Sequence, residues 1–283
     1  MAAGFLLPRC CFGEAVPWRR PGGPPDLLAL RDGAVELQVF ASQNREPMPD
    51  GPKIQKMFAE VAPGYDRANR ALSLGIDLWW RRQTVRMVGV VPGERGLDVC
   101  AGTGDLSFAL QRAGAQMVGA DFCAPMLTRA RQKGRPVGDA AATEAGPCFL
   151  AADTMSLPFP DHSFDFATVA FGIRNVSDPQ LGLREMARVV RPGGRVVVLE
   201  FAKPRVPLLG SAYRFYFRRV LPKLGAWISG AKNHAYQYLH DSVMAFPERE
   251  RFLALMRDAG LGSPRQRLLT GGVAAVYRGE VVA

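Results

Sequence analysis

The stretch Leu97-Asp98-Val99-Cys100-Ala101-Gly102-Thr103-Gly104-Asp105-Leu106 decides the fold of this chain. A short apolar run containing an acidic residue breaks into a glycine-rich turn, and the turn opens a helix. A second apolar run then ends in another acid, Asp121. Glycines let a backbone approach a ligand closely, and an acid at the end of the next strand can accept both ribose hydroxyls. These two segments therefore predict a nucleoside site at the carboxyl ends of neighbouring strands.

The glycine loop also restricts the kind of nucleoside. Gly102-Thr103-Gly104-Asp105 lacks the six-residue dinucleotide pattern, and no Lys-Ser/Thr follows it as a phosphate-binding loop requires. An acid beside the loop would also repel phosphate. We therefore expect a nucleoside without phosphates, and S-adenosylmethionine (SAM) is the commonest cofactor of that kind.

From residue 95 onward, apolar runs alternate with amphipathic segments. Strands that alternate with helices predict parallel βαβ units and a doubly wound, mostly parallel α/β sheet, with the ligand at the carboxyl ends of the strands. The predicted helices lie near 104–113, 124–133 and 179–190. The seven predicted strands are 96–101, 116–121, 148–152, 164–171, 195–201, 266–270 and 273–280. The last two are expected to pair antiparallel across Gly271-Gly272.

Composition divides the chain into an extension and one domain. Residues 1–48 are interrupted by Pro and Gly and keep no long periodic pattern, which predicts a poorly ordered extension. An organelle transit peptide is the alternative, although the five Arg of this segment are matched by five acidic residues, and transit peptides are poor in acids. Residues 49–283 are the expected folded domain, with N-terminal helices over 52–90 and a helical insertion over 203–245.

Acidic and polar residues follow the strand ends where the ligand is expected. Asp121 is the strongest candidate for a ligand contact, because an acid after the second strand has no packing role. Asp98 is expected either to bind the amino group of the ligand or to satisfy loop amides. Asp153 and Thr154 follow the third strand, where they suit an adenine amino group or a helix cap. The two glycines of the loop either admit the ligand or form an ordinary tight turn.

The fourth predicted strand ends at Ala170-Phe171-Gly172, facing the ligand. Arg174 and Asn175 lie just beyond it. An Arg-Asn pair at the carboxyl end of a strand is well placed to hold an oxygen-bearing substrate. A salt bridge or a cap is the structural alternative for the same two residues.

A net charge of +10 predicts an acidic partner, such as membrane lipid, nucleic acid or an anionic substrate. Between Phe201 and His240 there are seven Lys/Arg, no Asp or Glu, and several aromatic residues. Such a segment suits a membrane surface or a nucleic acid, and a plain core helix with a solvated rim is the alternative. Aliphatic residues such as Leu208 and Leu221 favour the membrane over nucleic acid.

Other chemistries lack their residues. The three histidines, His162, His234 and His240, show no metal-ligand spacing, so no metal is expected. No Gly-x-Ser-x-Gly motif is present, which argues against acyl hydrolysis. No uncharged apolar run reaches the roughly 18 residues of a membrane-spanning helix.

Taken together, these segments resemble the ubiquinone/menaquinone biosynthesis C-methyltransferases of the class I SAM-dependent methyltransferase family. The resemblance covers about residues 52–281. The glycine loop alone would indicate only a methyltransferase, whereas the other motifs are specific to this branch. The matching segments are Phe58–Asp66 with Asn69, Leu72–Ile76, Leu97–Leu106, Leu157–Phe159, Phe171–Val176, Glu200–Pro204, Tyr236–Leu239 and Ala259–Leu261.

The resemblance implies SAM-dependent carbon methylation of a prenylated hydroquinone: demethylmenaquinol to menaquinol, or a methoxy-benzoquinol on the way to ubiquinol. It implies SAM contacts for Thr103, Asp121, Asp153 and Thr154. The serine that the family carries before Phe-Gly is Ala170 here, so that contact is lost or becomes a backbone contact. The residues expected to hold the quinol oxygens are Tyr65, Asp66, Arg174 and Asn175.

The resemblance also implies a peripheral enzyme on the inner face of a bacterial membrane and a homodimer, without nucleic acid. A mitochondrial or plastid location applies if residues 1–48 are a transit peptide. Two functional alternatives stay open: a SAM-dependent methyltransferase of RNA or another small metabolite, and a cofactor-binding scaffold without catalysis. The sequence leaves open whether the quinol is a naphthoquinol or a benzoquinol.

Overall fold

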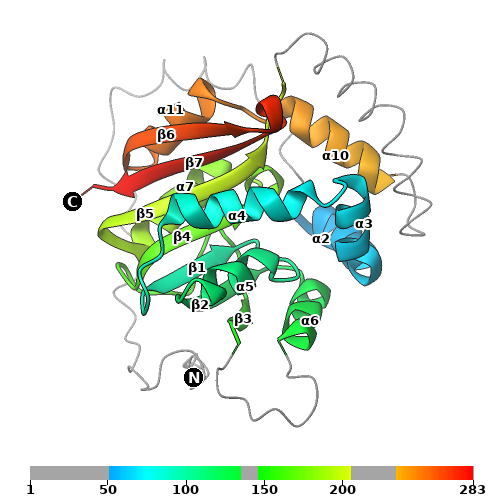
Figure 1. Ribbon diagram of the computed structural model, residues 1–283, viewed down its shortest axis with the longest axis horizontal. Helices are drawn as coiled ribbons and strands as arrows, with labels where there is room; N and C mark the ends of the chain where they lie inside the picture. Colours follow the sequence, from blue (N-terminus) through cyan, green and yellow to red (C-terminus); the bar gives the residue numbers. More distant parts are fainter. Residues whose placement is uncertain (1–50, 135–145, 205–233, 283) are drawn as a thin grey trace, which may run out of the picture. The chain divides into compact units, whose positions relative to one another are not determined.

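The computed structural model describes residues 51–134, 146–204 and 234–282, which fall in the unit Pro49–Ala283. Its centre is a seven-stranded sheet with the order β3-β2-β1-β4-β5-β7-β6 (Figure 1). The extension predicted over 1–48 and most of the insertion predicted over 203–245 lie outside the described residues. The strands are β1 (Arg95–Val99), β2 (Gln116–Asp121), β3 (Cys148–Ala151), β4 (Phe164–Ala170), β5 (Val190–Phe201), β6 (Leu261–Leu269) and β7 (Ala274–Val281).

Strands β1 to β5 pair in parallel, and β7 runs antiparallel to both β5 and β6. This confirms the doubly wound, mostly parallel sheet and the antiparallel pairing of the last two strands. The central strands are mostly apolar because helices cover both faces of a parallel sheet. Val196–Leu199 in β5, for example, is fully buried.

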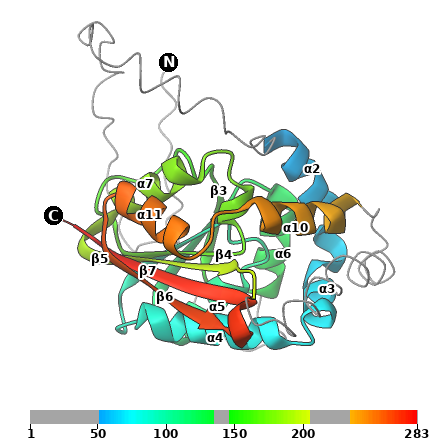
Figure 2. The same cartoon turned by 90° about the horizontal axis from the view of Figure 1, so that it is seen from above.

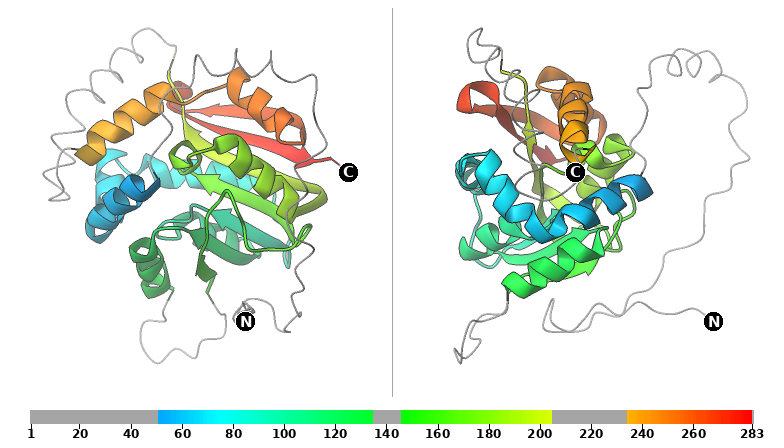
Figure 3. Two further views of the ribbon diagram at one scale, coloured as in Figure 1. Left: turned by 180° about the vertical axis from the view of Figure 1, so that it is seen from behind. Right: turned by 90° about the vertical axis from the view of Figure 1, so that its right-hand side faces the viewer.

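Helices α4 and α5 pack on one face of the sheet, and α7 and α11 pack on the other (Figures 2 and 3). The helices α2, α3 and the beginning of α10 gather at the end of the domain where the parallel strands finish. No helix in the part of the chain that the structure describes is long and apolar enough to cross a membrane. The helices are α2 (Gly51–Val61), η1 (Ala62–Gly64), α3 (Tyr65–Leu72), α4 (Ile76–Val88), α5 (Asp105–Arg112), α6 (Ala124–Lys133), η2 (Ile173–Asn175), α7 (Pro179–Val189), α10 (His234–Ala245), α11 (Glu250–Asp258) and η4 (Thr270–Gly272).

The turn between β1 and α5 needs its glycines for two different reasons. Gly102 and Gly104 both adopt left-handed backbone angles, with φ of 56° and 81°. A Cβ on Gly104 would also lie 2.6 Å from the ring of Phe149, so this position has no room for a side chain. Gly102 has open space around it and faces the cleft described below. The loop therefore combines a packing glycine with a cleft-facing glycine.

Two strands begin earlier than the sequence predicts. Strand β5 starts at Val190 rather than 195, because Val190 pairs with Phe164 before Arg191–Gly194 bulge out. Strand β6 starts at Leu261 rather than 266, and its pairing with β7 shifts across Ser263 and Pro264. Because β6 is an edge strand, it tolerates a proline that a central strand would exclude.

Candidate active site

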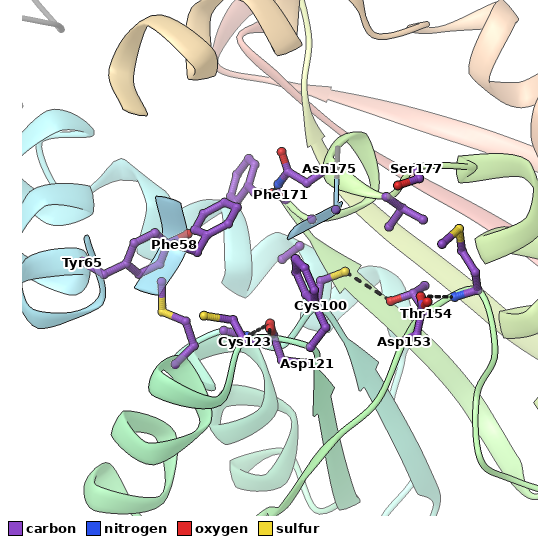
Figure 4. Close-up of a pocket in the computed structure, with 18 residues that line it drawn as sticks. Phe58, Tyr65, Cys100, Asp121, Cys123, Asp153, Thr154, Phe171, Asn175 and Ser177 are labelled. Carbon is purple, nitrogen blue, oxygen red and sulfur yellow. Dashed lines mark hydrogen bonds between the residues drawn. The ribbon is translucent and has the colours of Figure 1, made fainter. Parts of the chain in front are cut away.

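A cleft of about 800 Å³, counting its mouth, opens at the carboxyl ends of β1, β2 and β4 (Figure 4). Helices α2 and α3 close one side of it. The lining residues predicted from the sequence are Tyr65, Gly102, Asp121, Asp153, Thr154, Ala170 and Asn175. This position is the expected ligand site of a doubly wound sheet.

Asp121 forms the acidic floor of the cleft. It ends β2, is 7% exposed, and accepts a hydrogen bond from the Gly102 amide and another from the Cys123 amide, each at 2.8 Å. Burial raises the pKa of Asp121, and these amide hydrogen bonds oppose the rise. The carboxylate is thereby fixed between the glycine loop and α6, with lone pairs left for ligand hydroxyls.

Asp153 and Thr154 line the side of the cleft beside β1. The Asp153 carboxylate accepts a hydrogen bond from the Met155 amide at 2.9 Å, as a capping residue does. The Thr154 hydroxyl lies 3.4 Å from the Cys100 thiol. Burial raises the pKa of that thiol to about 12, so Cys100 stays neutral. The positions of Asp153 and Thr154 suit recognition of the polar edge of a neutral base.

The opposite side of the cleft is aromatic. Phe58 from α2, Tyr65 from α3 and Phe171 after β4 point into it (Figure 4). Burial raises the pKa of Tyr65, which keeps its phenol protonated at neutral pH. Asn175 adds an amide to this apolar side. The cleft therefore has a carboxylate-lined half and an aromatic half, and the polar groups of the aromatic half are the Tyr65 hydroxyl and the Asn175 amide.

Helix α10 holds the Asn175 side chain from behind. The Tyr238 hydroxyl donates to Asn175 Oδ1 at 3.1 Å, which orients the amide. Four residues along the same helix face, Ser242 Oγ lies 3.4 Å from Arg174 Nε. One helix face therefore fixes both members of the Arg-Asn pair.

Arg174 lies behind the cleft lining rather than in it. Its guanidinium donates to Glu200 Oε1 at 2.8 Å and to the Phe171 carbonyl at 2.6 Å, and both charged side chains are almost fully buried. The structure thus gives Arg174 the salt bridge that the sequence left as an alternative. A direct contact with a substrate would require it to exchange these partners.

Thr103 and Asp66 also lie outside the lining. The Thr103 hydroxyl donates to Asp66 Oδ1 at 2.6 Å, and Lys133 pairs with Asp66 Oδ2 at 2.7 Å. These contacts tie α3, which carries Tyr65, to the glycine loop and to the end of α6. Both residues therefore position the cleft walls in this structure.

Asp98 is buried beneath the loop. It is 1% exposed and accepts hydrogen bonds from Ser107 Oγ at 2.6 Å and Thr168 Oγ1 at 2.9 Å. Asp98 does not line the cleft. Its contacts are structural, as in the alternative in which it satisfies loop amides, but the donors are two hydroxyls rather than amides. Burial raises the pKa of Asp98 to about 6.

We expect the Asp98→Asn variant to lose part of the pH dependence of stability. The folded pKa of Asp98 lies above its unfolded value, so its contribution is full below about pH 4 and is lost as pH rises through 6. The wild-type free energy of unfolding should therefore fall by about 2 kcal/mol more than that of the variant between pH 4 and 7. Urea unfolding at several pH values measures this, and equal slopes would contradict the assignment.

Several lining residues were not predicted as site residues. In the sequence, Phe58 stands out only as part of a family motif, and Cys100 only as part of the glycine-loop segment. Cys123, Met126 and Met155 received no role, although they lie two to five residues after Asp121 or Asp153. The available signal was their position just after Asp121 and Asp153, since residues after a strand end meet the same cleft. Among the described residues, no group of three His, Cys, Asp or Glu could hold a metal ion.

Comparison with known proteins identifies the family. The profile of the ubiE/COQ5 methyltransferase family matches residues 48–280. The chain belongs to this family. Among curated ubiE/COQ5-type relatives, the demethylmenaquinone methyltransferase of Thermus thermophilus is 50% identical over 226 residues, 79% of this chain and 99% of that protein. The ubiquinone/menaquinone biosynthesis C-methyltransferase UbiE of Bdellovibrio bacteriovorus is 43% identical over 242 residues, 84% of this chain and 99% of that protein.

Solved structures support the class I SAM methyltransferase fold of this ubiE/COQ5 family member. A SAM-dependent methyltransferase of Thermotoga maritima, described as a possible histamine N-methyltransferase, matches with a TM-score of 0.55 and 21% identity, over 79% of this chain and 99% of that one. Phosphoethanolamine N-methyltransferase 2 of Haemonchus contortus, in complex with SAM, gives a TM-score of 0.52 and 13% identity, over 72% of this chain and 52% of that one. At these identities the likeness concerns the fold alone.

Proposed function

We propose that this protein transfers a methyl group from SAM to a ring carbon of a prenylated hydroquinone in menaquinone or ubiquinone biosynthesis. Family membership supports the methyl transfer and the SAM dependence. The single structural observation that carries the proposal is the cleft itself, which joins a half lined by strand-end carboxylates to an aromatic half. A nucleoside and an apolar ring with oxygens fit these two halves.

The carboxylate-lined half fits SAM. Asp121 would accept the ribose hydroxyls, and the Gly102 backbone leaves room for the close approach of the amino-acid portion. Asp153 and Thr154 would face the adenine ring, with Cys123 and Met126 as apolar neighbours. When bound, SAM supplies an electrophilic sulfonium methyl group.

The aromatic half would hold the quinol. Tyr65 and Asn175 line this half and would bind its oxygens, and Phe58 and Phe171 would supply flat apolar surface for its ring. Loss of a hydroquinone proton makes the ring carbon nucleophilic, so the cleft must align that carbon with the methyl donor and exclude water. Arg174 would act here by positioning, through the fixed Phe171–Asn175 turn.

Methyl transfer from labelled SAM to demethylmenaquinol and to the demethylated benzoquinol, side by side and with reductant present, tests the proposal. Product from one or both substrates supports it and identifies the ring. If neither substrate is methylated while SAM still binds, the proposed reaction is wrong. Methylation of RNA in the same assay would then favour the alternative suggested by the net charge of +10.

Cellular placement forms part of the same proposal. A prenylated quinol resides in the membrane, so the enzyme should act at the inner surface of a bacterial membrane as a peripheral protein. The resemblance to the family adds the proposal of a homodimer. Supporting this, the organisms of the relatives named above are bacteria.

We expect Tyr238→Phe to reduce methyl transfer about tenfold in kcat while leaving the KM for SAM unchanged. The lost hydroxyl no longer orients the Asn175 amide, and misplacement of a positioning group typically costs catalysis more than cofactor binding. Tyr277→Phe is the matched control. The Tyr277 hydroxyl accepts a hydrogen bond from the Arg249 amide at 3.0 Å, and this contact does not involve the cleft lining. Equal kinetics of both variants would contradict a positioning role for Tyr238.

A further inference from the structure

Exposed apolar side chains concentrate at the turn between α3 and α4. Of the eight large apolar residues that are exposed in the described parts of the chain, four lie between positions 74 and 79. Scattered exposed leucines need no explanation, but a cluster at one turn does. Their exposed fractions are 86% for Leu74, 37% for Ile76, 43% for Leu78 and 43% for Trp79.

The backbone of this turn presents its leucine in a disfavoured conformation. Leu74 has a φ of 51° and is followed by Gly75 with a φ of 76°. Left-handed angles suit Gly or Asn, whereas a leucine there is strained. Because the Leu74 side chain is the most exposed of the four, no packing within the described chain offsets that strain. The residue choice therefore points to a contact outside the described residues.

The exposed face of α4 continues the cluster with positive charge. At about 100° per residue, Leu78, Trp79, Arg82 and Arg86 fall within about 100° of the helix circumference. All four are exposed, and in the described structure neither arginine forms an ion pair. Asp77, the only acid between Arg67 and Val90, is buried and paired with Arg70 and Arg81. The outer surface is thus apolar at the turn and cationic along the helix.

We propose that the turn and the outer face of α4 (Leu74, Ile76, Leu78, Trp79, Arg82 and Arg86) form a docking surface for an anionic lipid bilayer. Aliphatic and tryptophan side chains enter the interface, while arginines bind anionic headgroups. The surface is distinct from the insertion over 203–245 that the sequence analysis assigned to the membrane.

Docking through this surface would also bring the cleft close to the membrane. Helix α3 has eight residues, so about 12 Å separates the turn from Tyr65 at its other end. Tyr65 lines the aromatic half of the cleft, where the quinol ring would sit. A prenyl tail leaving the ring could therefore stay in lipid. This last step rests on the proposed function, whereas the docking surface rests on exposure, strain and charge.

Vesicle cosedimentation of the full chain tests the proposal without any quinol. Wild-type protein should bind vesicles that contain phosphatidylglycerol more tightly than pure phosphatidylcholine vesicles. The Leu74→Asn/Leu78→Gln variant should bind at least about tenfold more weakly, because two apolar side chains no longer enter lipid. Asn suits the backbone of position 74, so folding should be kept. Val91→Asn/Leu268→Gln removes two other exposed apolar residues and should bind like the wild type.

Further measurements distinguish membrane docking from an effect on catalysis and from an interface between copies of the chain. Arg82→Gln/Arg86→Gln should abolish the preference for anionic vesicles. Methylation of a water-soluble, short-chain quinol should be unchanged in all these variants, because that reaction needs no bilayer. Unaltered vesicle binding by the Leu74→Asn/Leu78→Gln variant would overturn the proposal. So would a change from dimer to monomer in this variant, which would make the surface an interface between copies.

Discussion

Asp121→Ala should weaken SAM binding about 100-fold, the largest expected effect on the cofactor. Hydrogen bonds to a charged group contribute about 1.5–3 kcal/mol each, and two lost ribose contacts together account for about two powers of ten. The same change also leaves the amides of Gly102 and Cys123 without their acceptor, which loosens both the glycine loop and the start of α6. Isothermal titration calorimetry of SAM with the purified protein measures the effect.

Asp121→Asn refines this test. The amide keeps one oxygen for one backbone N–H but turns an NH2 group toward the other, so its affinity should lie between those of the wild type and the alanine variant. Asp258→Asn at the exposed end of α11 is the control and should bind SAM normally. Unchanged affinity of Asp121→Ala, with the fold intact by circular dichroism, would remove Asp121 from the site.

Arg174→Met should destabilise the protein by about 3–5 kcal/mol, because it leaves the buried Glu200 carboxylate without its counter-charge. The side chains of Arg174 and Glu200 are 6% and 1% exposed. Urea unfolding measures the loss. Arg191→Met is the matched control: it breaks an ion pair with Asp165 of similar length, 2.7 Å, but Arg191 is 48% exposed, and the cost should stay within about 1 kcal/mol.

The loss caused by Arg174→Met should grow with pH. Burial already raises the pKa of Glu200, and the charge of Arg174 opposes that rise. Without Arg174 the folded pKa of Glu200 rises further above its unfolded value, so stability is retained at acidic pH and falls as pH increases. The double variant Arg174→Met/Glu200→Gln removes the charge and keeps an acceptor for the Phe201 amide, so it should be more stable than Arg174→Met at pH 8. Equal stabilities would contradict this account.

The sequence by itself determined the fold. The alternation of apolar runs with helical segments predicted all seven strands and the antiparallel last pair, because burial on both faces leaves a strong periodic signal. The helix predicted over 124–133 has the bounds observed for α6, and the strand predicted over 116–121 ends at Asp121, as β2 does. The sequence missed the early starts of β5 and β6, since bulges at Arg191–Gly194 and near Pro264 interrupt the pattern while pairing continues.

The tertiary structure decided which polar residues face the cleft. Asp98 and Asp121 read alike in sequence, as acids in or after apolar strands, yet hydroxyl partners enclose Asp98 while Asp121 lies open to the cleft. Arg174 and Asn175 are neighbours in sequence, but the turn directs Arg174 inward to Glu200 and Asn175 toward the cleft. Two of the contacts that decide these cases, Arg174 with Glu200 and Asp98 with Thr168, join residues 26 and 70 positions apart, and local spacing carries no information about such partners.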